Sequence, residues 1–100
     1  MLTFKEMYDL GVKLGTAADP RGANGVKRYL ERVKREFADV KPSDKKYFEE
    51  ERLANPYHYD TRIHTGDVKA PIKRILAGID AGVGEVLLAT QLNERGKKID

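Results

Sequence analysis

The clearest pattern in the chain is an apolar stripe with a helical repeat between residues 20 and 39. Apolar residues recur there at steps of four, three, four and three, at Val26, Leu30, Val33, Phe37 and Val40. This spacing puts them on one face of an α-helix, with arginine and lysine on the outside. The preceding Asp19-Pro20 is a start signal, since it joins a side-chain acceptor to a residue without an amide donor. We therefore predict an amphipathic helix over 20–39.

Two further helices are predicted on either side of this one. Thr3 and Glu6 form a capping box, and apolar residues at helical spacing follow, so we expect a helix over 4–14 that ends at Gly15. Pro42-Ser43-Asp44 marks the start of a third helix. Asn55-Pro56 marks its end, because a residue before proline avoids helical angles.

The second half of the chain predicts strands and one helix. Residues 62–65 are expected to form a short strand, and Gly66-Asp67 a turn. Residues 72–79 read "IKRILAGI", and their apolar second half fits a strand buried on both faces. A helix is predicted over 83–95, stopped by Gly96, and residues 98–100 look like the approach to another strand.

These elements predict an α/β fold in which amino-terminal helices precede a partial β-β-α unit of a mixed or parallel sheet. Two strands are marginal alone, and the returning strand of a βαβ unit would lie beyond residue 100. We expect a single segment of a larger α/β domain, with residues 1–56 as a helical elaboration and 57–100 as the start of that domain. Pairing with a second copy would complete the sheet instead, and an exposed sheet edge favours a homo-oligomer.

Composition narrows the class of protein. The 100 residues are 40% hydrophobic and 35% charged, which suits one ordered domain. Cysteine is absent, so disulfides, thiolate nucleophiles and thiolate metal sites are excluded. No apolar run is long enough for a membrane span, and no secretory signal pattern opens the sequence. We expect no membrane partner and a cytoplasmic location.

The charge is unevenly spread along the chain. The formal net charge is +3, but residues 21–46 hold nine basic residues against four acidic ones. Two interpretations stay open: a solvated helix with surface ion pairs, or a nucleic-acid face. The candidate residues for that face are Arg28, Arg32, Lys34 and Arg35.

Few residues are candidates for chemistry. His58 and His64 are the two histidines, and a metal site within this chain would need them together with Asp60 or Asp67. Their spacing matches no recognised metal-binding pattern, so surface or interface histidines are the alternative interpretation. No serine or cysteine nucleophile pattern is present, and we assign no catalytic residue.

The predicted turn after residue 79 offers two further hypotheses. Gly82-x-Gly84 opens a helix after a strand, where phosphate binders place glycines, but Leu87 stands where a dinucleotide fingerprint has its third glycine. Asp80 follows the carboxyl end of the predicted strand, where α/β sheets carry their sites. It is expected either to cap the next helix or to lie beside a site.

The order of residues from Asp60 onward resembles a known family. The stretches "DTRIHTGD", "IKRILAGID" and "GEVLLATQLNERGKKID" are similar to the amino-terminal part of the Nif-three-like family, also labelled GTP cyclohydrolase I type two. The corresponding positions are Asp60, Gly66-Asp67, Lys73-Arg74 and Ile79-Asp80, and the resemblance covers residues 60–100.

This resemblance implies a scaffold for a dinuclear metal site. Family members are hydrolase-like proteins that hold two divalent cations, zinc, manganese or iron, and assemble into rings. Their paired metal-ligand histidines follow the strand expected to begin at Ile99, and further ligands come later still. The resemblance therefore implies that these 100 residues bind no cofactor and are inactive alone.

Overall fold

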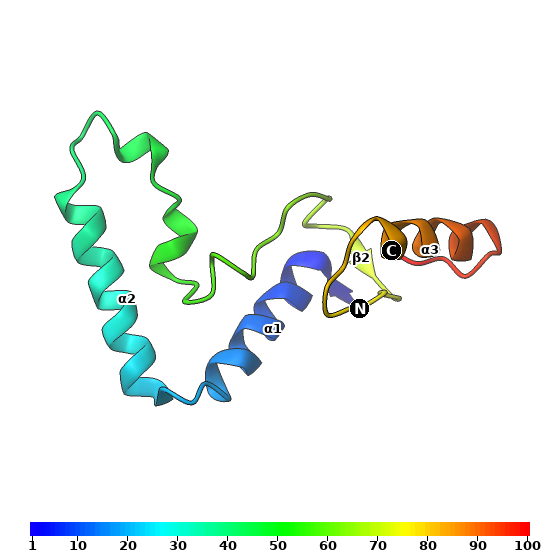
Figure 1. Ribbon diagram of the computed structural model, residues 1–100, viewed down its shortest axis with the longest axis horizontal. Coiled ribbons are helices and arrows are strands. Elements are labelled where there is room, and N and C mark those ends of the chain that lie inside the picture. The colour runs from blue at the N-terminus through cyan, green and yellow to red at the C-terminus, as the bar shows by residue number, and fades with distance from the viewer. The chain divides into compact units, whose positions relative to one another are not determined.

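The computed structural model describes residues 1–100 and contains three α-helices, two short 3₁₀ helices and a two-stranded sheet (Figure 1). The chain divides into two compact units. One, which we call the helical unit, comprises Tyr8–Gly66. The other, the sheet unit, joins Met1–Met7 to Asp67–Asp100.

Helix α1 (Phe4–Ala17) begins as the sequence predicts and ends later than predicted. Thr3 Oγ1 accepts a hydrogen bond from Glu6 N at 3.2 Å, and Glu6 Oε2 accepts one from Thr3 N at 2.8 Å, which confirms the capping box. The predicted stop at Gly15 is wrong. Backbone bonding continues beyond it, with Ala18 N donating to Leu14 O at 3.1 Å.

Helix α2 (Gly22–Asp39) carries the predicted apolar stripe. Val26 and Val33 are 5% and 1% exposed and are the buried hydrophobic core of the helical unit. Further along the same face, the Phe37 ring lies 4.9 Å from the Phe48 ring, centroid to centroid. The stripe therefore positions the chain that follows α2.

The third predicted helix, over residues 44–55, is wrong. The structure has two 3₁₀ turns instead, η1 (Lys45–Tyr47) and η2 (Glu50–Leu53). Phe48 and Glu49 between them are extended, with ψ values of 128° and 98°. Both residues make tertiary contacts, Phe48 with Phe37 and Glu49 with His58, and such contacts override helix propensity.

The sheet unit contains less strand than the sequence predicts. Strand β1 (Leu2–Thr3) pairs antiparallel with β2 (Pro71–Ile72), with Leu2 opposite Ile72 and Thr3 opposite Pro71. Residues 62–65 and 73–79 form no strand, so those predictions are wrong. The physical reason is the lack of a neighbouring strand to pair with in either stretch. Ile79 is fully exposed, the reverse of burial on both faces.

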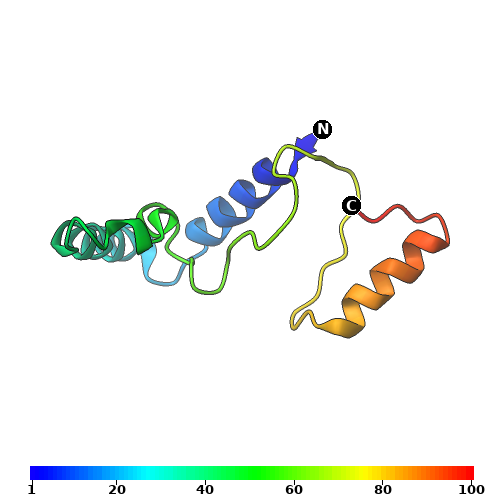
Figure 2. The same ribbon diagram turned by 90° about the horizontal axis from the view of Figure 1, so that it is seen from above.

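Helix α3 (Val83–Glu94) confirms the last predicted helix. It ends where expected, because Gly96 adopts a φ of +77° that glycine tolerates best. Figure 2 shows the residues after α3 returning toward the segment that precedes it. The observed fold is thus a mixture of helices with one small antiparallel sheet. None of its helices is both long and apolar enough to cross a bilayer.

Candidate functional site

The segment from Asn55 to Thr61 organises the polar contacts of the helical unit. Asn55 is 7% exposed and uses both ends of its amide. Its Nδ2 donates to Tyr8 Oη at 2.6 Å and to the Thr61 carbonyl oxygen at 2.7 Å. Its Oδ1 accepts from Tyr57 N at 2.8 Å, closing an Asx turn over Pro56. This one side chain ties the segment to α1.

A second tie joins the same segment to the connection between α1 and α2. Asp19 Oδ2 accepts hydrogen bonds from Tyr57 Oη at 2.7 Å and from Arg21 Nη2 at 2.9 Å. The Asp19 side chain is only 6% exposed. The Arg21 guanidinium first, and then the Tyr57 hydroxyl, hold the pKa of Asp19 well below its usual range because both donate to its charged form.

His58 forms the third contact of this segment and is buried, with 6% exposure. Its Nε2 lies 2.6 Å from Glu49 Oε2, and its Nδ1 lies 3.7 Å from Glu51 Oε2. The hydrogen bond from His58 lowers the pKa of Glu49. His58 is thus a buried residue that contacts Glu49 at the start of η2, so of the two alternatives to a metal ligand, surface or interface histidine, exposure at the surface is wrong.

The remaining metal candidates are exposed residues of the two units. His64, Asp60 and Asp67 are exposed, and Asp67 Oδ1 accepts from Lys69 N at 2.9 Å in a local turn. Within residues 1–100, no group of three or more histidine, aspartate or glutamate side chains is placed to hold a metal ion.

The start of α3 is capped by a residue that the sequence analysis did not single out. Glu85 Oε2 accepts from Gly82 N at 2.6 Å, and this backbone bond lowers the pKa of Glu85. Gly82 is the N-cap residue, so the prediction that Asp80 caps this helix is wrong. The Glu85 carboxylate already occupies the amide that a phosphate would approach, which disfavours the phosphate hypothesis.

The four basic candidates on α2 are exposed but do not share one face. Arg28, Arg32 and Arg35 follow a spacing of four and three, which aligns them along the helix. Arg32 Nε lies 3.9 Å from Glu36 Oε1, and its guanidinium carbon lies 5.2 Å from the centre of the Tyr29 ring. Lys34 lies on a different side, where it lines a hollow.

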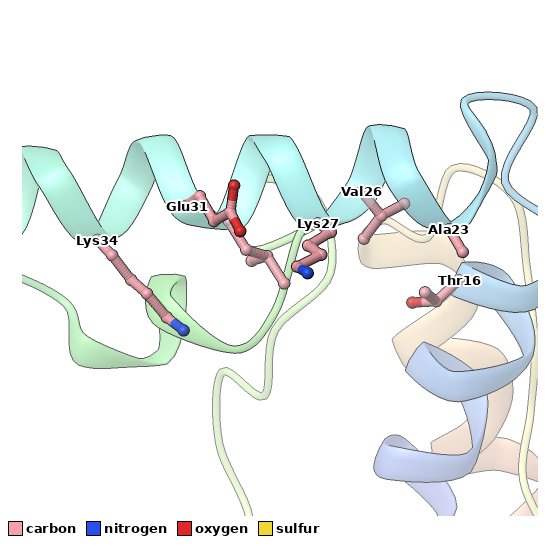
Figure 3. A pocket seen from close by; sticks show the side chains of 7 residues that line it. Thr16, Ala23, Val26, Lys27, Glu31 and Lys34 are labelled. Atoms are coloured by element: carbon pink, nitrogen blue, oxygen red, sulfur yellow. The ribbon is translucent and has the colours of Figure 1, made fainter.

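That hollow lies between the end of α1 and the first half of α2 and has a volume of about 300 Å³ (Figure 3). It is open to solvent, and most of its lining is apolar. The lining residues are Thr16, Ala23, Val26, Lys27, Leu30, Glu31 and Lys34. The figure shows Lys27, Glu31 and Lys34 projecting from the same side of α2.

In the sheet unit, the Asp100 carboxylate is bound by the backbone just after β2. Asp100 Oδ2 accepts from Lys73 N at 2.7 Å and from Arg74 N at 2.8 Å. Asp100 N donates to the Arg74 carbonyl oxygen at 2.9 Å. The two amide bonds lower the pKa of Asp100. Residues 73–74 and 100, on either side of α3, are therefore joined directly.

Comparison with known proteins gave no match: no family model, no curated protein and no solved structure is similar to this chain. Function is therefore inferred from the residues of this chain and their contacts.

Proposed function

We propose that this chain is the amino-terminal part of a Nif-three-like metal-binding, hydrolase-like protein, to which it contributes scaffold. The observation that carries the proposal is the tie between Asp100 and residues 73–74. The order of parts is that of a βαβ unit: an extended stretch, then α3, then a returning stretch that meets the first through one backbone hydrogen bond and the Asp100 carboxylate. The same order of parts is implied by the sequence resemblance from Asp60 onward.

Uncovered apolar side chains in the sheet unit support the idea of a larger α/β domain. Ile75 and Ile79 are 53% and 101% exposed in the stretch that was expected to be a buried strand. On α3, Val83 and Val86 are 77% and 66% exposed. Parallel sheets are normally covered on both faces, so further strands beside residues 74–79 would bury these side chains. The finer fold, a partial unit of a larger sheet, is part of the proposal.

The proposed metal chemistry does not belong to the residues described here. A pair of zinc, manganese or iron ions would activate water for hydrolysis in the complete protein. The side chains of this chain do not fit the role of metal ligands. His58 is buried against Glu49, and neither Asp60 nor His64 belongs to a group of three or more possible ligands. We therefore assign the ligands to polypeptide after Asp100 and no reaction step to this chain. A cytoplasmic homo-oligomer is the setting we propose for the complete protein.

Elemental analysis of purified protein tests this assignment. We expect the 100-residue chain to retain no stoichiometric zinc, manganese or iron. A longer chain, continued through the next strand and the histidines proposed to follow it, should retain two ions per protomer. Stoichiometric metal on the short chain that disappears in both His58→Ala and His64→Ala variants would refute the proposal. Light scattering on both chains measures the oligomeric state, so the oligomer hypothesis is tested independently of the metal content.

A small basic binding module is the alternative function. It depends on the line of Arg28, Arg32 and Arg35 along α2, with Lys34 beside it. The expected result is binding of RNA or DNA that weakens steeply as salt rises, because counterions are released from the phosphates. Fluorescence polarisation with labelled oligonucleotides measures this. A flat titration at low salt would remove the nucleic-acid alternative.

A further inference from the structure

The hollow between α1 and α2 is an incompletely covered part of the helical unit. Ala23, Val26 and Leu30 are apolar lining residues on α2, at a helical spacing of three and four residues. The second half of the same stripe is already covered, since α2 packs against η2 and Phe37 against Phe48. The stripe on α2 thus continues beyond the residues that cover it.

One edge of this hollow carries an ordered pattern of charge. Lys27, Glu31 and Lys34 follow one another at steps of four and three along α2 and line the same side. The two lysines are two helical turns apart, about 10 Å along the axis. All three side chains are exposed, so this edge is available to a partner.

We propose that the hollow binds an amphipathic helix of another protein that has an apolar stripe and, along one edge, two acidic residues seven positions apart. The apolar stripe would cover Leu30, and the acidic residues would meet Lys27 and Lys34. A basic residue between them would meet Glu31. Helices dock into apolar grooves in this way, with anchor residues at helical spacing and charged edges that set the choice of partner.

The charge pattern disfavours the two other occupants. In an antiparallel pair of two copies of α2 that covers the full length of the hollow, twofold symmetry would place Lys27 of each copy opposite Lys34 of the other, and like charges repel. A small amphiphile would leave one of the lysines without a partner, and the hollow is too open to enclose it as ligand pockets do.

Two synthetic peptides of about 20 residues test the proposal, each a helix about 30 Å long with a leucine stripe. One has glutamates seven positions apart beside the stripe, and the other has lysines at those positions. Fluorescence anisotropy with the full 100-residue chain should show binding of the acidic-edged peptide, with the basic-edged peptide about tenfold weaker. Equal binding of both peptides, or binding of neither, would overturn the proposal.

Charge-reversal variants make the test specific to this hollow. The double variant Lys27→Glu with Lys34→Glu should prefer the basic-edged peptide. The double variant Arg28→Glu with Arg35→Glu is the matched control, because it reverses two basic charges seven positions apart on another side of α2, and it should leave the preference unchanged. Circular dichroism checks that each variant is folded. A preference that is the same in the double variant as in the original chain contradicts the proposed site. So does a concentration-dependent dimer that excludes the peptides.

Discussion

At the scale of single residues, the Asn55 side chain joins Tyr8, Tyr57 and Thr61 through three hydrogen bonds. Replacing it with alanine removes three hydrogen bonds and leaves the groups that it joins without their partners. We expect Asn55→Ala to lower the free energy of unfolding by about 2–3 kcal/mol. Urea unfolding followed by circular dichroism measures the change. Asn24→Ala, at an exposed position on α2, is the control and should cost less than about 0.5 kcal/mol.

The lowered pKa of Asp19 predicts how the stability of the helical unit depends on pH. Its pKa is lowered in the folded protein, whereas an unfolded aspartate titrates near pH 4. Its contribution to stability is therefore present above about pH 4 and is lost as the pH falls through the lower, folded value. We expect Asp19→Asn to be less stable than the original chain at about pH 6, with a difference that shrinks toward about pH 2.

Urea midpoints measured across this pH range test the prediction for Asp19. Asp39→Asn provides the comparison, because Asp39 is an exposed aspartate at the end of α2. A difference between Asp19→Asn and the original chain that stays constant down to the lowest pH would show that the Asp19 charge does not stabilise the fold.

Single residues also show what the sequence could and could not predict. The capping box at Thr3 and Glu6 was predictable because both partners lie within one turn. The Asx turn at Asn55 could have been found in the same way, since Asn-Pro is a turn signal. The pairing of Glu49 with His58 could not, because it joins two loop residues through a tertiary contact that leaves no periodic pattern.

At the scale of elements, the two glycines at the ends of α3 predict opposite effects of the same substitution. Gly96 has a φ of +77°, so Gly96→Ala should weaken the end of α3 by about 1 kcal/mol. Gly84 lies within the helix, and an added methyl group would meet nothing within 4 Å. Gly84→Ala should therefore strengthen α3 by about 0.5–1 kcal/mol. Amide hydrogen exchange along α3 reports both changes, and two effects of the same sign would contradict this account.

The elements also explain why helices were predicted better than strands. A helix satisfies its backbone within itself, so the patterns at α1, α2 and α3 were sufficient evidence for them. A strand needs a partner, and the stretch at 72–79 has one only where β1 reaches Pro71–Ile72. The failed third helix has a different cause, because Phe48 and Glu49 are extended by contacts with α2 and His58.

At the scale of the whole molecule, a substitution in the core of the helical unit should lower the stability of that unit and leave the stability of the sheet unit unchanged. Val33 is 1% exposed and belongs to the helical unit. We expect Val33→Ala to destabilise that unit by about 2 kcal/mol, through lost burial and a residual cavity. Protection of the amides of α3 in the sheet unit should stay unchanged. Hydrogen exchange with mass spectrometry distinguishes this result from a uniform loss of protection, which would indicate a single cooperative unit.

The pairing of β1 with β2 has a consequence for the order of folding. The helical unit is an insertion in chain topology, because both of its ends connect to the sheet unit and Lys5 N donates to the Val68 carbonyl oxygen at 3.0 Å. On the ribosome, Leu2 and Thr3 emerge before Pro71 and Ile72 and must wait for them before they can pair. The inserted residues can fold during that interval, so β1 is synthesised before the helical unit but completes its pairing after that unit has formed.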